Sequence, residues 1–276
     1  MATYKGIQGY SVQNLSSDPT ASKVEGQLWY NNSTGKFKIA VAGAGVWAAT
    51  NAINTGRAYG VGTGTNTAAL FASGNPGTTT SVESFDGTSW TEMSANLNTG
   101  RSNAIGEGTS TASMFAGGYI SAPSVLTETW NGTSWTEVNI MNTGRYGSSS
   151  AGTSTAALAI AGNSYPGAIV NQVESWDGTS WTETSTDINT ARYYLVGFGT
   201  TTAAIAATGN VPGSPYSAIC ESFNGTSWAE VADVNTTRQN AGSSGIQTAG
   251  VLFGGETATP SYAIVGTTNT WDGTSW

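Results

Sequence analysis

Short apolar segments, separated by turns of Gly, Asn, Thr and Pro, run along most of this chain. In one representative stretch they predict strands over residues 102–106, 112–117 and 126–130, with a fourth strand beginning at Trp135. No segment sustains the 3.6-residue apolar period of an amphipathic helix. The pattern therefore predicts an all-β fold, and we expect no helices.

The pattern returns five times with a common consensus. A unit starts with Arg, passes through Gly-Thr-x-Thr-Ala and a small apolar run ending in Gly, and closes with Glu-Ser-Phe/Trp-Asp/Asn-Gly-Thr-Ser-Trp. The Arg and the Gly that ends the apolar run are always 17 residues apart, and the Glu position always precedes the last Trp by 7 residues. The distance from that Gly to the Glu position varies from 9 to 14 residues. We expect structural anchors at Arg57, Arg101, Arg145, Arg192, Arg238, Trp90, Trp135, Trp181, Trp228 and Trp276.

Repeats of 43 to 48 residues with four strands each are typical of a β-propeller, here with five blades. Small residues such as Gly62, Gly106 and Ser149 fit an innermost strand, where the blades crowd around the axis. The Asp-Gly or Asn-Gly pairs predict hairpin turns between the third and fourth strands. These pairs are at 86–87, 131–132, 177–178, 224–225 and 272–273.

The start of the chain predicts how the ring closes. Residues 46–50 read as an isolated fourth strand, because Trp47 precedes Arg57 by ten residues, as Trp135 precedes Arg145. We expect this strand to pair near 266–271 and to complete the last blade. The propeller would then span 46–276, and residues 1–45 would form an arm with a hairpin of strands 28–30 and 36–39. A six-bladed ring, with residues 28–47 in a further blade, stays open.

Strands in a blade alternate in direction, so the loops between second and third strands should share one rim with the segments that carry the arginines. Both kinds of segment vary, and six of the seven prolines lie in those loops. Tyrosines on Pro-stiffened loops favour recognition, and sugars suit an acidic surface without histidine. Tolerated insertion without any ligand is the alternative. The candidate ligand-binding residues are Tyr119, Tyr146, Tyr165, Tyr193, Tyr216 and Tyr262.

Charge and composition exclude several classes of function. All four lysines lie in the first 38 residues, and the remainder carries five arginines against fifteen acids, which disfavours nucleic acid. No apolar stretch is long enough to cross a bilayer, so we expect no membrane insertion, and the N-terminus lacks the blocks of a signal peptide. Cys220 replaces a Val of other units, so we expect a small buried side chain.

Catalysis is not expected. The chain has no histidine, which removes the commonest general base and metal ligand, and we predict no catalytic residue, metal or cofactor. Most acids recur in unit after unit, whereas a catalytic residue is normally singular. We expect each repeated arginine to pair with a Glu or to cap carbonyl groups between blades. Glu107, Asp187, Asp233 and Glu256 lie off the repeat and have no obvious partner.

Residues 46 to 276 resemble kelch repeats, whose pattern of Gly-Gly, an aromatic residue, Trp and Arg is matched by Gly117-Gly118, Trp130, Trp135 and Arg145. The first Gly is often replaced, as by Ser73 or Ala161. The resemblance implies a five-bladed kelch-like β-propeller.

Residues 18–38, with Gly-Gln-Leu-Trp-Tyr-Asn at their centre, resemble a region near the N-terminus of bacteriophage tail-fibre and other virion proteins, especially those of marine hosts. This resemblance implies a structural protein of the virion. The arm would dock to other virion proteins, and the loops would bind a host-surface glycan or receptor; a homo-oligomer is also possible. The alternatives are a structural decoration or spacer of the virion without a ligand, and a secreted lectin-like module.

Overall fold

The computed structural model describes residues 13–15, 28–33, 36–39, 49–214, 216–257 and 263–276. The chain divides into two compact units, Met1–Ala49 and Thr50–Trp276. In the first unit, β2 (Leu28–Asn31) and β3 (Lys36–Ile39) form the antiparallel hairpin that the sequence predicts. A third strand, β1 (Gln13–Leu15), pairs in parallel with β2 and was not foreseen.

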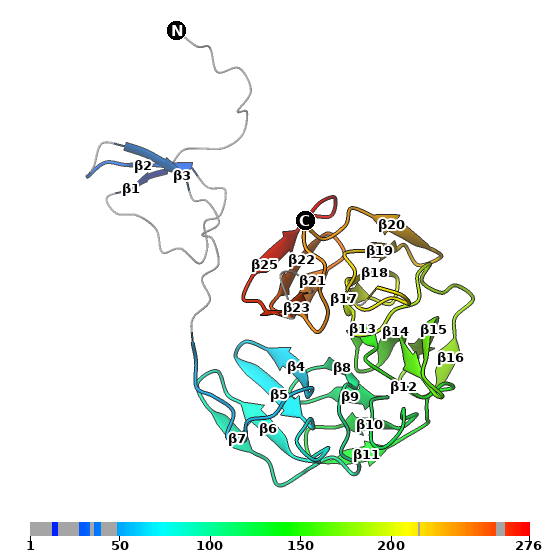
Figure 1. Cartoon of the computed structure of the whole chain (residues 1–276). Helices are drawn as coiled ribbons and strands as arrows, with labels where there is room; N and C mark the ends of the chain where they lie inside the picture. The colour runs from blue at the N-terminus through cyan, green and yellow to red at the C-terminus, as the bar shows by residue number, and fades with distance from the viewer. Residues whose placement is uncertain (1–12, 16–27, 34–35, 40–48, 215, 258–262) are drawn as a thin grey trace. The chain divides into compact units, whose positions relative to one another are not determined.

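The second unit is a five-bladed β-propeller of antiparallel sheets, as predicted (Figure 1). From the axis outward, blade 1 consists of β4 (Val61–Thr65), β5 (Ala68–Ala72), β6 (Val82–Phe85) and β7 (Trp90–Glu92), and blade 2 of β8 (Ile105–Gly108), β9 (Ser113–Ala116), β10 (Thr127–Trp130) and β11 (Trp135–Glu137). Blade 3 consists of β13 (Ser149–Thr153), β14 (Ala156–Ser164), β15 (Ala168–Trp176) and β16 (Trp181–Glu183), and blade 4 of β17 (Val196–Thr200), β18 (Ala203–Ala207), β19 (Cys220–Phe223) and β20 (Trp228–Val231). Blade 5 consists of β21 (Gly242–Ile246), β22 (Ala249–Phe253) and β25 (Thr268–Trp271). Within the described ranges we find no helix long and apolar enough to cross a membrane.

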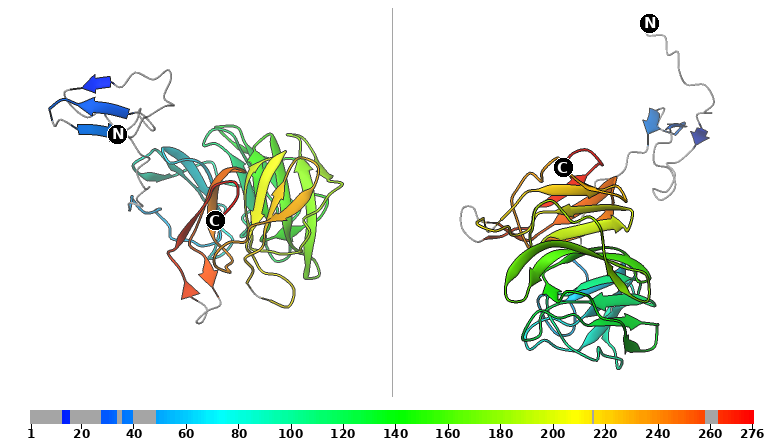
Figure 2. Two further views of the ribbon diagram at one scale, coloured as in Figure 1. Left: turned by 90° about the horizontal axis from the view of Figure 1, so that it is seen from above. Right: turned by 90° about the vertical axis from the view of Figure 1, so that its right-hand side faces the viewer.

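Two blades carry extra strands. In blade 3, β12 (Arg145–Tyr146) pairs with the long strand β14. In blade 5, β23 (Glu256–Thr257) and β24 (Ala263–Ile264) form a short hairpin. In the left view of Figure 2 this orange hairpin extends past the sheets on the same side as the loop between β18 and β19.

The predicted closing strand falls largely on residues 46–48, which lie outside the described residues. Ala49 and Thr50 belong to no strand. In the part of the chain that the structure describes, β25 pairs with β22 alone, so closure by an N-terminal strand stays a prediction. The six-bladed alternative is not supported, because β2 and β3 belong to the first unit.

The core lies at the seams between neighbouring blades. Met114 and Ala116 of β9 are buried against blade 3, whereas Phe115, between them in sequence, packs in a cluster with Leu70 of blade 1. Burial on both faces of β9 explains why Met114, Phe115 and Ala116 are all apolar rather than alternating with polar residues. Similar clusters fill the seams between blades 3 and 4 and between blades 4 and 5. Among the described residues, no such cluster joins blade 5 to blade 1.

Buried ion pairs anchor the blades, as the repeat predicted. In the first four blades, the Arg before the inner strand reaches the Glu of the third strand of the same blade, and both side chains are at most 1% exposed. Arg101 Nη1 lies 3.1 Å from Glu128 Oε1. The other carboxylate oxygen, Glu128 Oε2, accepts hydrogen bonds from the backbone and side-chain amides of Asn98 at 2.7 and 2.9 Å. Charge-assisted bonds of this kind hold the Glu in one orientation.

Among the described bonds, four of the five arginines also join two blades through the backbone carbonyl. The amide of Gly118 in blade 2 donates to the carbonyl of Arg145, whose guanidinium is bound in blade 3, at 2.8 Å. The same bond runs from Gly162 to Arg192 and from Gly209 to Arg238, at 2.9 Å each. In blades 3 and 4, the Arg and the Gly that lie 17 residues apart are therefore the acceptor of one such bond and the donor of the next.

Candidate functional site: the loop rim

The propeller has two rims, and the variable segments gather on one of them. In every blade the residue after the Arg bridges the residue after the Gly that ends the second strand. The loops between second and third strands therefore share a rim with the segments that carry the arginines, as predicted. We call this the loop rim, and the opposite side, formed by the turns at 65–68 and 86–89 and their equivalents, the turn rim. The five bridges are Ala58–Asn75, Ser102–Tyr119, Tyr146–Asn163, Tyr193–Asn210 and Gln239–Glu256.

A chain of backbone hydrogen bonds crosses the blades at the loop rim. The second residue after each Arg has a positive φ, which for Tyr59 is 59° and for Tyr194 is 56°. Such values are uncommon outside glycine and turn these residues toward the axis. The amide of each donates to the carbonyl of its counterpart one blade earlier, at 2.6 to 3.0 Å, in four consecutive links. The residues are Tyr59, Asn103, Gly147, Tyr194 and Asn240; a link from Tyr59 to Asn240 is not among the described bonds.

These five residues surround a cavity of about 570 Å³ at the loop-rim end of the central channel. One position depends on glycine. A Cβ at Gly147, whose φ is 62°, would lie 2.8 Å from Cδ1 of Tyr194. Gly147 therefore lets the ring of Tyr194 pack closely over the backbone of blade 3.

Four tyrosines make one aromatic cluster on this rim, which we call the tyrosine cluster: Tyr119, Tyr146, Tyr193 and Tyr194. Ring centroids are 5.2 Å apart for Tyr119 and Tyr146, 6.3 Å for Tyr146 and Tyr193, and 4.5 Å for Tyr193 and Tyr194. Tyr119 is 39% exposed and the others are half-buried. Burial, reinforced by the adjacent Tyr193 and Tyr119, raises the pKa of Tyr146, and burial also raises the pKa of Tyr194. Both phenols therefore stay neutral near physiological pH.

The structure unites only some of the candidate residues. Tyr119, Tyr146 and Tyr193 lie together, whereas Tyr165 lies apart, 77% exposed in the turn between β14 and β15. Tyr216 is only 5% exposed and therefore offers little surface to a ligand. Tyr262 lies outside the described residues. Tyr59 and Tyr194 were not predicted from the sequence as rim residues. Each lies two residues after an anchor Arg, which the sequence shows, but the positive φ that exposes this position to the channel could not be read from it.

A short polar chain lies beside the mouth of the channel. The side-chain amide of Gln239 donates to Glu256 Oε2 at 3.0 Å, and that of Asn210 donates to Gln239 Oε1 at 3.3 Å. Glu256 lines the 570 Å³ cavity together with the amide side chains of Asn103 and Asn240. Aromatic faces beside amide and carboxylate groups that form hydrogen bonds suit a ligand with many hydroxyl groups.

Other chemical groups in the propeller are occupied or shielded. The repeated glutamates at 83, 128, 174 and 221 are bound in the buried ion pairs. Cys220 is fully buried in the seam between blades 4 and 5, as predicted, and burial raises the pKa of its thiol to about 11. Within the described residues, no group of three or more His, Cys, Asp or Glu side chains is placed to hold a metal ion.

Comparison with known proteins identifies no relative, since no protein-family model and no curated protein matches this chain. A five-bladed β-propeller with a tyrosine-bearing rim is therefore the most specific description that the structure assigns.

Proposed function

We propose that this protein is a non-enzymatic structural protein of a bacteriophage particle, and that its kelch-like propeller binds a host-surface glycan at the loop rim. The observation that carries the recognition role is the tyrosine cluster beside the mouth of the channel. The phage context comes from the resemblance of residues 18–38 to the arm of tail-fibre and virion proteins. Residues 1–45 would attach the protein to other virion proteins.

The physical case for a glycan rests on shape and charge. Tyrosine rings offer flat apolar area for stacking on a sugar ring, and each loses little rotamer freedom on binding. Tyr146 is already packed by Tyr119, Tyr193 and Tyr194, so its ring is oriented before any ligand arrives. The formal net charge of −8 favours neutral over anionic ligands.

The test is binding of the purified full chain to a glycan array and to bacterial cells. Wild type should bind a defined set of glycans, and Tyr146→Ala should lose binding because it removes the central ring of the cluster. Tyr165→Ala serves as the matched control, since it removes an exposed tyrosine of the same rim outside the cluster. Thermal unfolding of each variant reports whether the fold is retained.

The same experiment separates the alternatives. A protein that binds no glycan and no cell surface would be a structural decoration or spacer of the virion. Loss of binding in Tyr165→Ala but not in Tyr146→Ala would move the site to the hairpin of blade 3 and would refute the cluster.

A further inference from the structure

The turn-rim end of the central channel holds a second cavity, which the proposed glycan site does not use. It has a volume of about 470 Å³, within the range of sites for small molecules. Inner strands of all five blades line it, mostly with Gly, Ser and Thr. Among the described residues that line this cavity, Glu107 is the only ionisable side chain.

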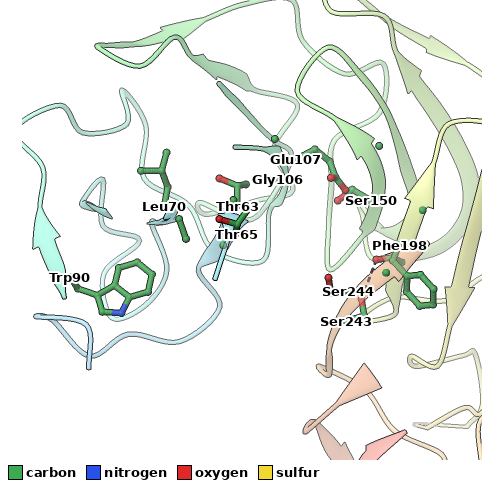
Figure 3. A pocket seen from close by; sticks show the side chains of 18 residues that line it. Thr63, Thr65, Leu70, Trp90, Gly106, Glu107, Ser150, Phe198, Ser243 and Ser244 are labelled. Carbon is green, nitrogen blue, oxygen red and sulfur yellow. Dashed lines mark hydrogen bonds between the residues drawn. The ribbon is translucent and has the colours of Figure 1, made fainter. Parts of the chain in front are cut away.

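Glu107 is singular in the repeat. It occupies the position before the conserved glycine of the inner strand, where the other blades have Thr63, Ala151, Phe198 and Ser244. Figure 3 shows its side chain directed at Ser150 of the next blade, to whose hydroxyl it is hydrogen bonded. A position that carries no charge in the other four blades therefore places one carboxyl group in the channel.

Glu107 is half-buried and differs from the fully buried carboxyl groups of the repeat. Those at Glu83, Glu128, Glu174 and Glu221 each contact an arginine, whereas no ion pair of Glu107 is found in the described part of the chain. Partial burial raises the pKa of Glu107 to about 7, and none of the other described residues that line the cavity carries a charge. An acid that is partly removed from water and has no counter-ion is destabilising in its charged form, and a cationic ligand would reduce that penalty.

We propose that this cavity binds a small organic cation with a primary ammonium group, held by the Glu107 carboxylate and the hydroxyl group of Ser150. An ammonium group donates three hydrogen bonds and accepts none, which matches the two oxygens of one carboxylate and one hydroxyl oxygen. Ca²⁺ fits less well, because it takes six to eight oxygen ligands and usually several carboxylates. The site is independent of the glycan site at the loop rim.

The test uses the full chain and n-propylammonium chloride in isothermal titration calorimetry. At about pH 8 we expect saturable binding, which should weaken about tenfold or more at about pH 5.5, where Glu107 is protonated. Glu107→Gln should weaken binding at pH 8 by a similar factor. Glu137→Gln, which neutralises an exposed glutamate of the same blade, should leave it unchanged. The neutral isostere n-propanol should not bind comparably.

Several results would overturn the proposal. These are absence of saturable binding to wild type, equal binding by Glu107→Gln or by n-propanol, and saturable binding of Ca²⁺ in place of the ammonium ion. If Glu107→Gln does not fold, carbon-13 NMR of the wild-type carboxyl group decides. The ligand should lower the pKa of Glu107, and an unchanged pKa would contradict the assignment.

Discussion

The two rims of the propeller are built by the same five repeats but are held together differently. At the turn rim, side chains repeat along with the backbone, since Asp86 Oδ1 accepts bonds from the amides of Thr88 and Ser89, and Asn131 does the same one blade later. At the loop rim, the backbone links repeat while the side chains change from Tyr59 to Asn103 to Gly147. There the fold depends on main-chain bonds, so the side chains are free to vary.

The comparison implies that the residues that stabilise the fold are different from the loop-rim side chains that would bind a ligand. The anchors that both rims share, the buried Arg–Glu pairs, lie inside the blades. A change to an anchor should disturb both rims, whereas a change to a loop-rim side chain should alter binding with little effect on stability.

The largest effect is expected from Glu128→Ala. It leaves the buried guanidinium of Arg101 without its carboxylate, which should reduce the free energy of unfolding by about 3–5 kcal/mol. Chemical denaturation measures this, with Glu137→Ala as an exposed control that should change stability by less than about 0.5 kcal/mol. Equal effects of the two substitutions would contradict the anchor role.

Blade 5 permits the reverse experiment. Arg238 is buried, but its partner at the Glu position is Asn269, whose Oδ1 accepts from Nη2 at 2.7 Å. Asn269→Glu should recreate the ion pair and raise the free energy of unfolding by about 1–3 kcal/mol. Asn269→Gln, a longer but uncharged side chain, is the control, and a gain as large as that of Asn269→Glu would show that charge is not responsible.

Glu107 makes the turn-rim end of the channel sensitive to pH. Its folded pKa of about 7 lies above the ordinary value of 4.5, so its contribution to stability is complete below about pH 4.5 and is lost as pH rises through 7. Glu107→Gln should abolish this loss, which we expect to be roughly 1–2 kcal/mol at pH 8 relative to pH 5. Urea denaturation at both pH values tests it; an identical pH dependence in wild type and variant would be the contrary result.

The aspartates of the turn rim should make the stability of the propeller depend on pH in the acid range, and this effect should be smaller than that of Glu107. Hydrogen bonds from the backbone amides of Ser89 and Thr88 lower the pKa of Asp86, and equivalent bonds act on Asp177 and Asp272. Because these pKa values are depressed, stability is present above about pH 3.8 and is lost as pH falls below it. The triple Asp→Asn variant should fold, since Asn131 and Asn224 make the same turn, and its acid unfolding should be less steep. No change in slope would contradict this.

Much of the fold was predictable because each turn has its own chemistry. The Asp-Gly and Asn-Gly pairs predicted the hairpins, and the constant spacing between Arg101 and Gly118 reflected the bridge within one blade between the residues that follow them, Ser102 and Tyr119. The loop rim was less predictable. Tyr59, Asn103 and Tyr194 share a left-handed backbone that no common residue type signals, and no local sequence pattern indicates that Tyr216 is buried. The pairing of β1 with β2 is a parallel contact that local turn signals do not encode.

The most direct test compares the two rims in one binding assay. With the strongest glycan from the array, affinity is measured for wild type, for the loop-rim variant Tyr146→Ala/Tyr193→Ala and for the turn-rim variant Thr88→Ala/Thr179→Ala. We predict that the loop-rim variant binds at least about tenfold more weakly, a loss of about 1.4 kcal/mol, and that the turn-rim variant binds like wild type. Unchanged affinity in the loop-rim variant, or an equal loss in both, would contradict recognition at the loop rim.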